Sequence, residues 1–190
     1  MPRPPDYEAS RAFGKLAAAL DAFSVDPRDA VCADFGCHAG GFTDCLLQRG
    51  AARVYAVDRG YGVLDLRLRR DPRVSVRERT DAMRVFLPEA VDGVTIDVGW
   101  TRQQYILPAA RRLLKASVPG AWIISLIKPH YEAEPARLQS GVLPPEHHPP
   151  LLESLRAAIP PLGLRLDGEV ASPVPGHGGN HEYLWLLRPV

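Results

Sequence analysis

Two charged residues lie in strongly apolar segments of this sequence. Asp97 interrupts the run GVTIDVGW (93–100), and Lys128 ends the run AWIISLIK (121–128) directly before Pro129. A carboxylate or an ammonium is costly to bury unless it is paired or used in function. The two residues therefore indicate either a structural salt bridge at a sheet edge or a reactive centre in which an acid and an amine handle a polar substrate.

A glycine-rich segment follows the apolar run VCADFG (31–36). Gly36, Gly40 and Gly41 allow a sharp turn and a close approach of the backbone to a ligand, and a helix predicted from Gly41 offers free amide groups. The dinucleotide fingerprint G-x-G-x-x-G requires glycine at position 38, where His38 stands. The segment therefore argues against a nicotinamide-dependent dehydrogenase.

Acids follow the next two predicted strands. Asp58 ends RVYAVD (53–58), about 20 residues after the glycines, which is the spacing at which an acid binds ribose hydroxyls. Asp81 comes just past VSVRERT (74–80), where it could face an adenine edge or serve a loop. A nucleoside-containing ligand is consistent with both positions.

Other potentially reactive side chains give weaker indications. Glu182 follows a glycine-rich loop and by itself indicates only a hairpin. The cysteines are odd in number and lack C-x-x-C spacing, so we expect structural thiols: Cys32, Cys37 and Cys45. The histidines in a proline loop and beside the glycine hairpin do not predict a metal site: His147, His148, His177 and His181.

Alternating helices and strands must position these side chains. The spacing of Leu16 and Leu20 with two phenylalanines predicts a helix over 9–23, with Lys15 about 100° outside its apolar stripe and pointing sideways. Further helices are predicted from Gly41 to Gly50, over 101–115 and from Pro149 to Ile159. Strands are predicted over 31–36, 53–58, 74–80, 93–100 and 121–128, with a closing pair over 164–174 and 182–188.

Strands separated by helices predict an α/β fold with a mostly parallel seven-stranded sheet and helices on both faces. Ligands bind such a sheet beyond the carboxyl ends of the strands, near the point where strand order reverses. We expect residues 1–8 to form a flexible N-terminal segment and residues 9–190 a single domain.

Net charge and hydropathy limit the cellular compartments and the binding partners that fit this sequence. The net charge is +1, no apolar run reaches 18 residues, and the N-terminus lacks an apolar signal-peptide centre, which together favour a cytoplasmic protein with no membrane partner. The segment 67–79 holds six arginines and two acids, a local excess of +4. That run is either a solvated face or a surface that grips phosphates.

Six segments together resemble the FtsJ-like RNA 2'-O-ribose methyltransferases, most closely the TlyA (haemolysin A) branch, over residues 7–188. The segments are SRAFGKL (10–16), DFGCHAGGFTDCLLQRGA (34–51), VDRGYG (57–62), ERTDA (78–82), SLIKPHYE (125–132) and GHGGNHEYL (176–184). The resemblance implies a Rossmann-like class I S-adenosylmethionine-dependent methyltransferase fold. It also implies the catalytic domain without the basic N-terminal RNA-binding domain that this branch carries.

The resemblance further implies the residues of the site. A catalytic Lys-Asp-Lys-Glu tetrad falls on Lys15, Asp97, Lys128 and Glu182. The cofactor S-adenosyl-L-methionine would be held by Gly36, Gly40, Gly41, Phe42, Asp58, Asp81 and Asp97. The implied partner is structured RNA, ribosomal RNA above all, with no metal, and we assume a monomer.

Methyl transfer to a ribose hydroxyl requires removal of the hydroxyl proton, and we hypothesise that Lys128 is the base. Because a free lysine has a pKa of ~10.4, that pKa would have to fall. Lys15 and burial would lower it, whereas Asp97 and Glu182 would raise it. Lys128 could instead stay charged and orient the hydroxyl.

Two other functions remain open. A non-catalytic module could keep the cofactor pocket and bind only RNA or a protein, because Ala12, Phe13, Gly99 and Trp100 replace the paired glycines, the serine and the phenylalanine of the branch. Alternatively, the methyl acceptor could be a small molecule.

Overall fold

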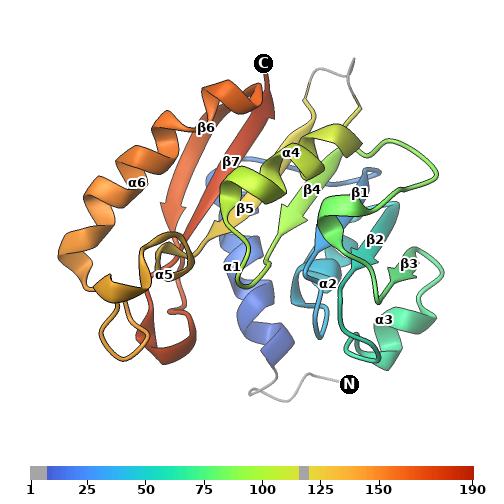
Figure 1. Ribbon diagram of the computed structural model, residues 1–190. Coiled ribbons are helices and arrows are strands. Elements are labelled where there is room, and N and C mark those ends of the chain that lie inside the picture. Colours follow the sequence, from blue (N-terminus) through green and yellow to red (C-terminus); the bar gives the residue numbers. More distant parts are fainter. Residues whose placement is uncertain (1–7, 116–119) are drawn as a thin grey trace.

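Seven strands form one mostly parallel sheet within the described residues, 8–115 and 120–190, of the computed structural model (Figure 1). The strands are β1 (Val31–Phe35), β2 (Arg53–Val57), β3 (Val74–Arg77), β4 (Gly93–Ile96), β5 (Trp122–Ile127), β6 (Leu164–Ala171) and β7 (Tyr183–Pro189). Their order is β3-β2-β1-β4-β5-β7-β6, in which β7 runs antiparallel to both of its neighbours and the other pairs are parallel. The predicted α/β sheet is confirmed.

Helices cover both faces of the sheet (Figure 1). They are α1 (Glu8–Ala22), α2 (Gly41–Gln48), α3 (Leu66–Arg70), α4 (Gln103–Leu113), α5 (Pro129–Glu132) and α6 (His148–Ala157). One apolar core joins Leu16 of α1 to Ile124 of β5, and the other joins Ile106 of α4 to Ile123 of the same strand. Adjacent strand residues point to opposite faces, so β5 contributes to both cores and is buried along its whole length.

α1 carries Lys15 to the edge of the sheet. Leu16 and Leu20 are 0% and 1% exposed and fix one side of the helix against the core. Lys15 lies beside this stripe, as its position in the helical pattern predicts. Its side chain therefore reaches past the core to the segment that precedes β7, where it finds a partner.

β3 and β4 are shorter than the predicted strands 74–80 and 93–100. Left-handed backbone at Arg79 (φ 52°) ends the extended chain after β3. β4 ends at Ile96, the partner of Phe35, where β1 itself gives way to the turn at Gly36 (φ 78°). Asp97 is consequently the first residue after β4 and does not lie inside a strand.

α3 was not predicted, because it lies in the arginine-rich segment that shows no apolar period. Asp65 begins this helix by accepting a hydrogen bond from the Arg67 amide (2.7 Å), and Leu68 is buried beneath it. Several arginines of the segment are thereby fixed on a short helix at the edge of the sheet.

The described residues bear on two remaining predictions. The predicted flexible segment 1–8 lies outside them except for Glu8, at which α1 begins. No helix in the described part of the chain combines the length and the apolar character needed to cross a membrane.

Candidate active site

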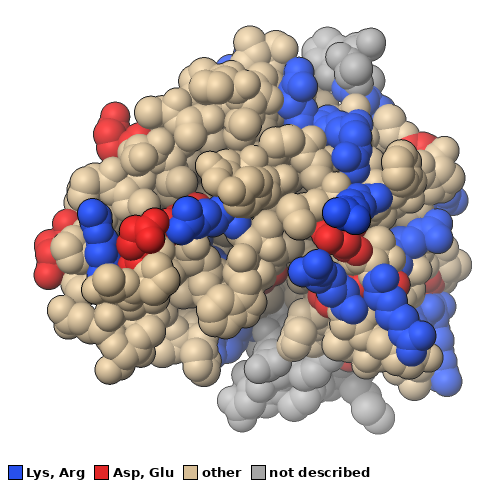
Figure 2. All heavy atoms as spheres, viewed as in Figure 1, with Lys and Arg blue, Asp and Glu red and all other residues tan. Residues whose placement is uncertain are grey.

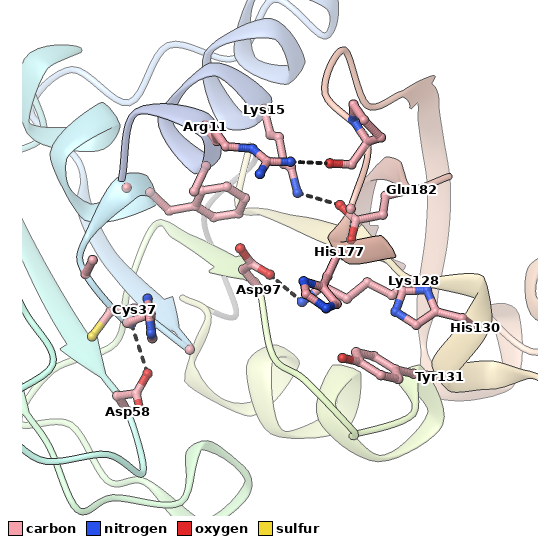
Figure 3. Close-up of a pocket in the computed structure, with 18 residues that line it drawn as sticks. Arg11, Lys15, Cys37, Asp58, Asp97, Lys128, His130, Tyr131, His177 and Glu182 are labelled. Atoms are coloured by element: carbon pink, nitrogen blue, oxygen red, sulfur yellow. Dashed lines mark hydrogen bonds and ion pairs between the residues drawn. The ribbon is translucent and has the colours of Figure 1, made fainter. Parts of the chain in front are cut away.

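A cavity of about 440 Å³ opens at the carboxyl ends of β1 and β4, between which the strand order reverses. Doubly wound sheets bind their ligands at this place. Figure 3 shows charged and aromatic side chains converging on it from α1, the strand ends and the loop before β7. Eight of the ten predicted site residues line it: Lys15, Gly36, Gly41, Phe42, Asp58, Asp97, Lys128 and Glu182.

Four charged side chains form two ion pairs in this cavity (Figure 3). Lys15 Nζ lies 2.5 Å from Glu182 Oε2, and Lys128 Nζ lies 2.6 Å from Asp97 Oδ1. Lys15 and Glu182 are 8% and 5% exposed, so their pair is almost removed from water. The fold thus brings together the four residues that were predicted to meet.

Lys128 keeps its proton in this arrangement. Burial lowers its pKa, but the negative charges of Asp97 and Glu182 raise it by more, so the pKa lies above the ordinary lysine value. The ammonium also donates a hydrogen bond to the Val98 carbonyl oxygen (3.3 Å). Of the two roles considered for Lys128, the charged orienting role is therefore the one that this environment favours.

The turn after β1 requires glycine because its backbone touches the segment after β4. Gly36 has φ 78°, and a Cβ atom there would lie 2.5 Å from the Asp97 carbonyl oxygen. Gly40 has φ 99° and precedes α2, whose first residues Gly41 and Phe42 line the cavity. The amides of Gly41 and Phe42, at the start of α2, can thus face an anionic group of a ligand, whereas that of Thr43 binds Asp34.

Asp34 lies beneath this turn and was not predicted to have a role. Its carboxylate is fully buried and accepts hydrogen bonds from the hydroxyls of Thr43 (2.7 Å) and Thr95 (2.9 Å). Burial raises its pKa to about 7, although the two hydroxyls act in the opposite direction. The three side chains tie β1, α2 and β4 together directly below the cavity.

The raised pKa of Asp34 predicts a pH-dependent stability. The unfolded carboxyl ionises near the ordinary aspartate pKa of 3.8 and the folded one near a pKa of about 7, so this contribution to stability is complete below about pH 4 and is lost as the pH rises towards 7. In Asp34→Asn this loss of stability with rising pH should disappear. The difference in melting temperature between variant and parent, measured from pH 4 to pH 8, should rise with pH and then level; a constant difference contradicts the assignment.

The two acids after β2 and β3 line a second, smaller cavity of about 110 Å³. Asp58 accepts hydrogen bonds from the amides of His38 (2.9 Å) and Gly60 (2.7 Å), which leaves further lone pairs on both oxygens. Asp81 accepts from the Met83 amide (3.0 Å) and pairs with Arg59 (3.2 Å), so it serves its loop while lining the smaller cavity.

Asn180 is a further residue that the sequence did not single out. Its buried side chain accepts a hydrogen bond from the Leu143 amide (3.2 Å) and donates to the carbonyls of Gly141 (3.1 Å) and His177 (3.0 Å). These bonds fix the loop that carries Glu182 into the cavity. The sequence offered one signal for this role, an asparagine in the glycine-rich loop two residues before Glu182.

Aromatic rings stand at the mouth of the cavity. Trp100 is 86% exposed and its ring lies 4.7 Å from that of Tyr131, centroid to centroid. Tyr131 and Ala12 line the cavity itself. Two of the positions at which this chain departs from the branch pattern are thus at the cavity: Ala12 lines it and Trp100 contacts a residue that lines it.

The cysteines and histidines form no further reactive site in the residues that the structure describes. The three thiols are buried and form no disulfide with one another: Cys32, Cys37 and Cys45. Burial raises the pKa of Cys32 and Cys37, which keeps both thiols protonated and unreactive. Within the same residues, no group of His, Cys, Asp and Glu is arranged to hold a metal ion.

A doubly wound sheet with a glycine turn after β1 and an acid after β2 is a Rossmann-like fold, and its structural neighbours are S-adenosylmethionine-dependent methyltransferases. A model of the family described as FtsJ-like methyltransferase matches residues 9–188, and the chain belongs to that family.

Relatives and a solved structure agree with this assignment. TlyA of Mycobacterium tuberculosis, a 16S/23S rRNA (cytidine-2'-O)-methyltransferase, is 41% identical over 186 residues, which cover 93% of this chain and 67% of that protein. Hemolysin A of Brachyspira hyodysenteriae is 33% identical over 181 residues, covering 92% of this chain and 74% of its own length. A candidate hemolysin from Streptococcus thermophilus superposes with a TM-score of 0.90 at 33% identity, covering 100% of this chain and 70% of that structure.

Proposed function

We propose that this protein transfers a methyl group from S-adenosylmethionine to a ribose 2'-hydroxyl of structured RNA, ribosomal RNA in particular. The observation that carries the proposal is the convergence of two lysine–carboxylate pairs on one cavity beside the glycine turn. The activity named for the M. tuberculosis relative supports the choice of a ribose hydroxyl and of ribosomal RNA.

The residues present fit S-adenosylmethionine as the cofactor. Gly36 and Asp58 line both cavities, so an extended ligand can run from one to the other. The first turn of α2 would hold its carboxylate, Asp58 its ribose hydroxyls, and the smaller cavity with Asp81 its adenine. When bound, S-adenosylmethionine supplies an electrophilic methyl group on a positively charged sulfur.

Lys128 and Asp97 have complementary tasks at the acceptor hydroxyl. The Lys128 ammonium donates a hydrogen bond to the hydroxyl oxygen and fixes its direction of approach. The hydroxyl proton becomes strongly acidic as its oxygen bonds to the methyl group and gains a third substituent, so the second carboxylate oxygen of Asp97 can accept it. Lys15 and Glu182 complete the wall of the cavity as a neutral pair that excludes water.

RNA would approach over a basic surface. Figure 2 shows lysine and arginine side chains gathering on the half of this face that holds β2, β3 and α3. Within the run 67–79, Arg69 is not available to RNA, because it pairs with Glu78, which also accepts the amides of residues 62–64. Arg69, together with the amides of Gly62 and Leu64, lowers the pKa of Glu78 to about 2. Arg70 and Arg77 are exposed and would contact phosphates.

Tritiated methyl incorporation tests the proposal. The parent protein should transfer label from S-adenosylmethionine to unmethylated ribosomal RNA, and the label should appear in a 2'-O-methylnucleoside. Lys15→Ala should lower the rate at least about 100-fold and still bind the cofactor. Cofactor binding without any transfer by the parent would favour a binding module, and transfer unaffected by Lys15→Ala would contradict a role for the buried pair.

A further inference from the structure

His130 is a buried histidine in the wall of the cavity that the proposed reaction does not use. It follows Lys128 by two residues, at the start of α5, and is 8% exposed. Its Nδ1 is sealed from solvent and has no hydrogen-bond partner among the described residues. The ring nevertheless lines the same cavity as Lys128 and Asp97 (Figure 3).

Packing alone does not account for a histidine at this position. A buried polar atom without a partner costs free energy, and such atoms are few in native proteins. The His130 ring packs on Tyr131, with centroids 4.2 Å apart, a contact that an apolar side chain could make without an unpaired nitrogen. The imidazole is therefore better explained by a ligand that reaches it through the cavity.

The state of the ring defines which ligand atom it can bind. Burial lowers the pKa of His130 to about 4, and the charge of Lys128 and the nearby His148 act in the same direction, so the imidazole is neutral at physiological pH. The neutral ring carries its proton on one of its two nitrogens. If that proton is on Nε2, the buried Nδ1 has only an unpaired acceptor, which costs less than a buried N–H donor without a partner. Nε2 is then a single hydrogen-bond donor, and its partner must be an acceptor atom.

We propose that His130 binds the acceptor nucleotide, with its Nε2–H donating a hydrogen bond to an oxygen of the nucleotide whose hydroxyl lies beside Lys128. The inference rests on the proposed function and adds to it a substrate-binding residue. A neutral donor two residues from the Lys128 ammonium holds the nucleotide at a second point, so the hydroxyl cannot rotate away from Lys128 and Asp97.

Two substitutions separate this role from packing. His130→Leu removes the donor together with the unpaired nitrogen, so the melting temperature should stay equal or rise. The KM for RNA should rise at least about tenfold while the Kd for S-adenosylmethionine stays within about twofold. His130→Gln keeps an N–H donor of similar reach and should restore the KM to within about threefold of the parent value.

His147→Leu is the matched control, because His147 is a partly buried histidine that lines a separate cavity, of about 170 Å³. It should leave the KM for RNA unchanged. A KM in His130→Leu equal to that of the parent, or a Gln variant as impaired as the Leu variant, overturns the role of His130 while RNA methylation by the parent stands. A parent that transfers no methyl group to RNA overturns the proposed function and this inference with it.

Discussion

Replacing Lys128 with alanine is expected to lower the single-turnover rate of methyl transfer by about 10³-fold while the affinity for S-adenosylmethionine stays within about threefold. The substitution removes the donor that orients the acceptor oxygen and leaves Asp97 without its partner at 2.6 Å. Lys115→Ala is the matched control, because Lys115 also forms a lysine–aspartate pair, with Asp92 (2.7 Å), outside the cavity. A rate in Lys128→Ala within tenfold of the parent would contradict the assignment.

The pH dependence of the parent rate distinguishes the two roles of Lys128. A base must be neutral, and below the pKa the neutral fraction rises tenfold for each pH unit. Burial lowers the pKa of Lys128, but Asp97 and Glu182 raise it by more. A base would therefore give a rate that still climbs at pH 9, whereas a charged orienting group gives a flat profile. We expect the flat profile; a rising limb that vanishes in Lys128→Ala would reinstate the base.

Gly36→Ala is expected to weaken S-adenosylmethionine binding by at least about 100-fold. The new Cβ would lie 2.5 Å from the Asp97 carbonyl oxygen, so the turn after β1 or the segment after β4 must shift. Both segments line the two cavities, and a shift in either distorts them. Calorimetric titration with the cofactor measures the loss.

Gly50→Ala is the control for the backbone part of this effect. Gly50, after the end of α2, also has a positive φ (91°), but a Cβ there would meet only Arg28, in ordinary contact at 3.4 Å or more. It should cost about 1–2 kcal/mol of stability, as alanine does in left-handed backbone, and leave cofactor affinity unchanged. Equal affinities in Gly36→Ala and Gly50→Ala would show that the close approach of Gly36 to Asp97 is not needed for binding.

The sheet could be predicted from the sequence because each of its elements has a strong local signal. The apolar runs around Asp34 and before Lys128, the glycine turn and the helical stripe of α1 are all features of short windows. The ends of β3 and β4 could not be predicted, since they depend on the left-handed backbone of Arg79 and on the point at which the neighbouring β1 ends. α3 was missed because its cap and its arginines resemble a loop.

The composition of the site was predicted, but its pairing was not. The sequence placed two lysines and two acids at strand and loop ends, yet which acid meets Lys15 depends on contacts across 167 positions. The charge of Lys128 likewise depends on how deeply it is buried and how close Asp97 and Glu182 lie to it, which only the fold determines. Asn180 and His130 lay inside recognised segments and gained their roles only from what the fold packs around them.

The position of β7 has a consequence for biosynthesis. β7 follows β6 in the sequence but lies between β5 and β6, so β6 has no neighbour and β5 keeps an open edge until residues 183–189 leave the ribosome. Glu182, which precedes β7, reaches Lys15 only at the same late moment. A nascent chain that has not yet released residues 182–189 cannot form the Lys15–Glu182 pair, so the wall of the cavity is completed only when β7 joins the sheet.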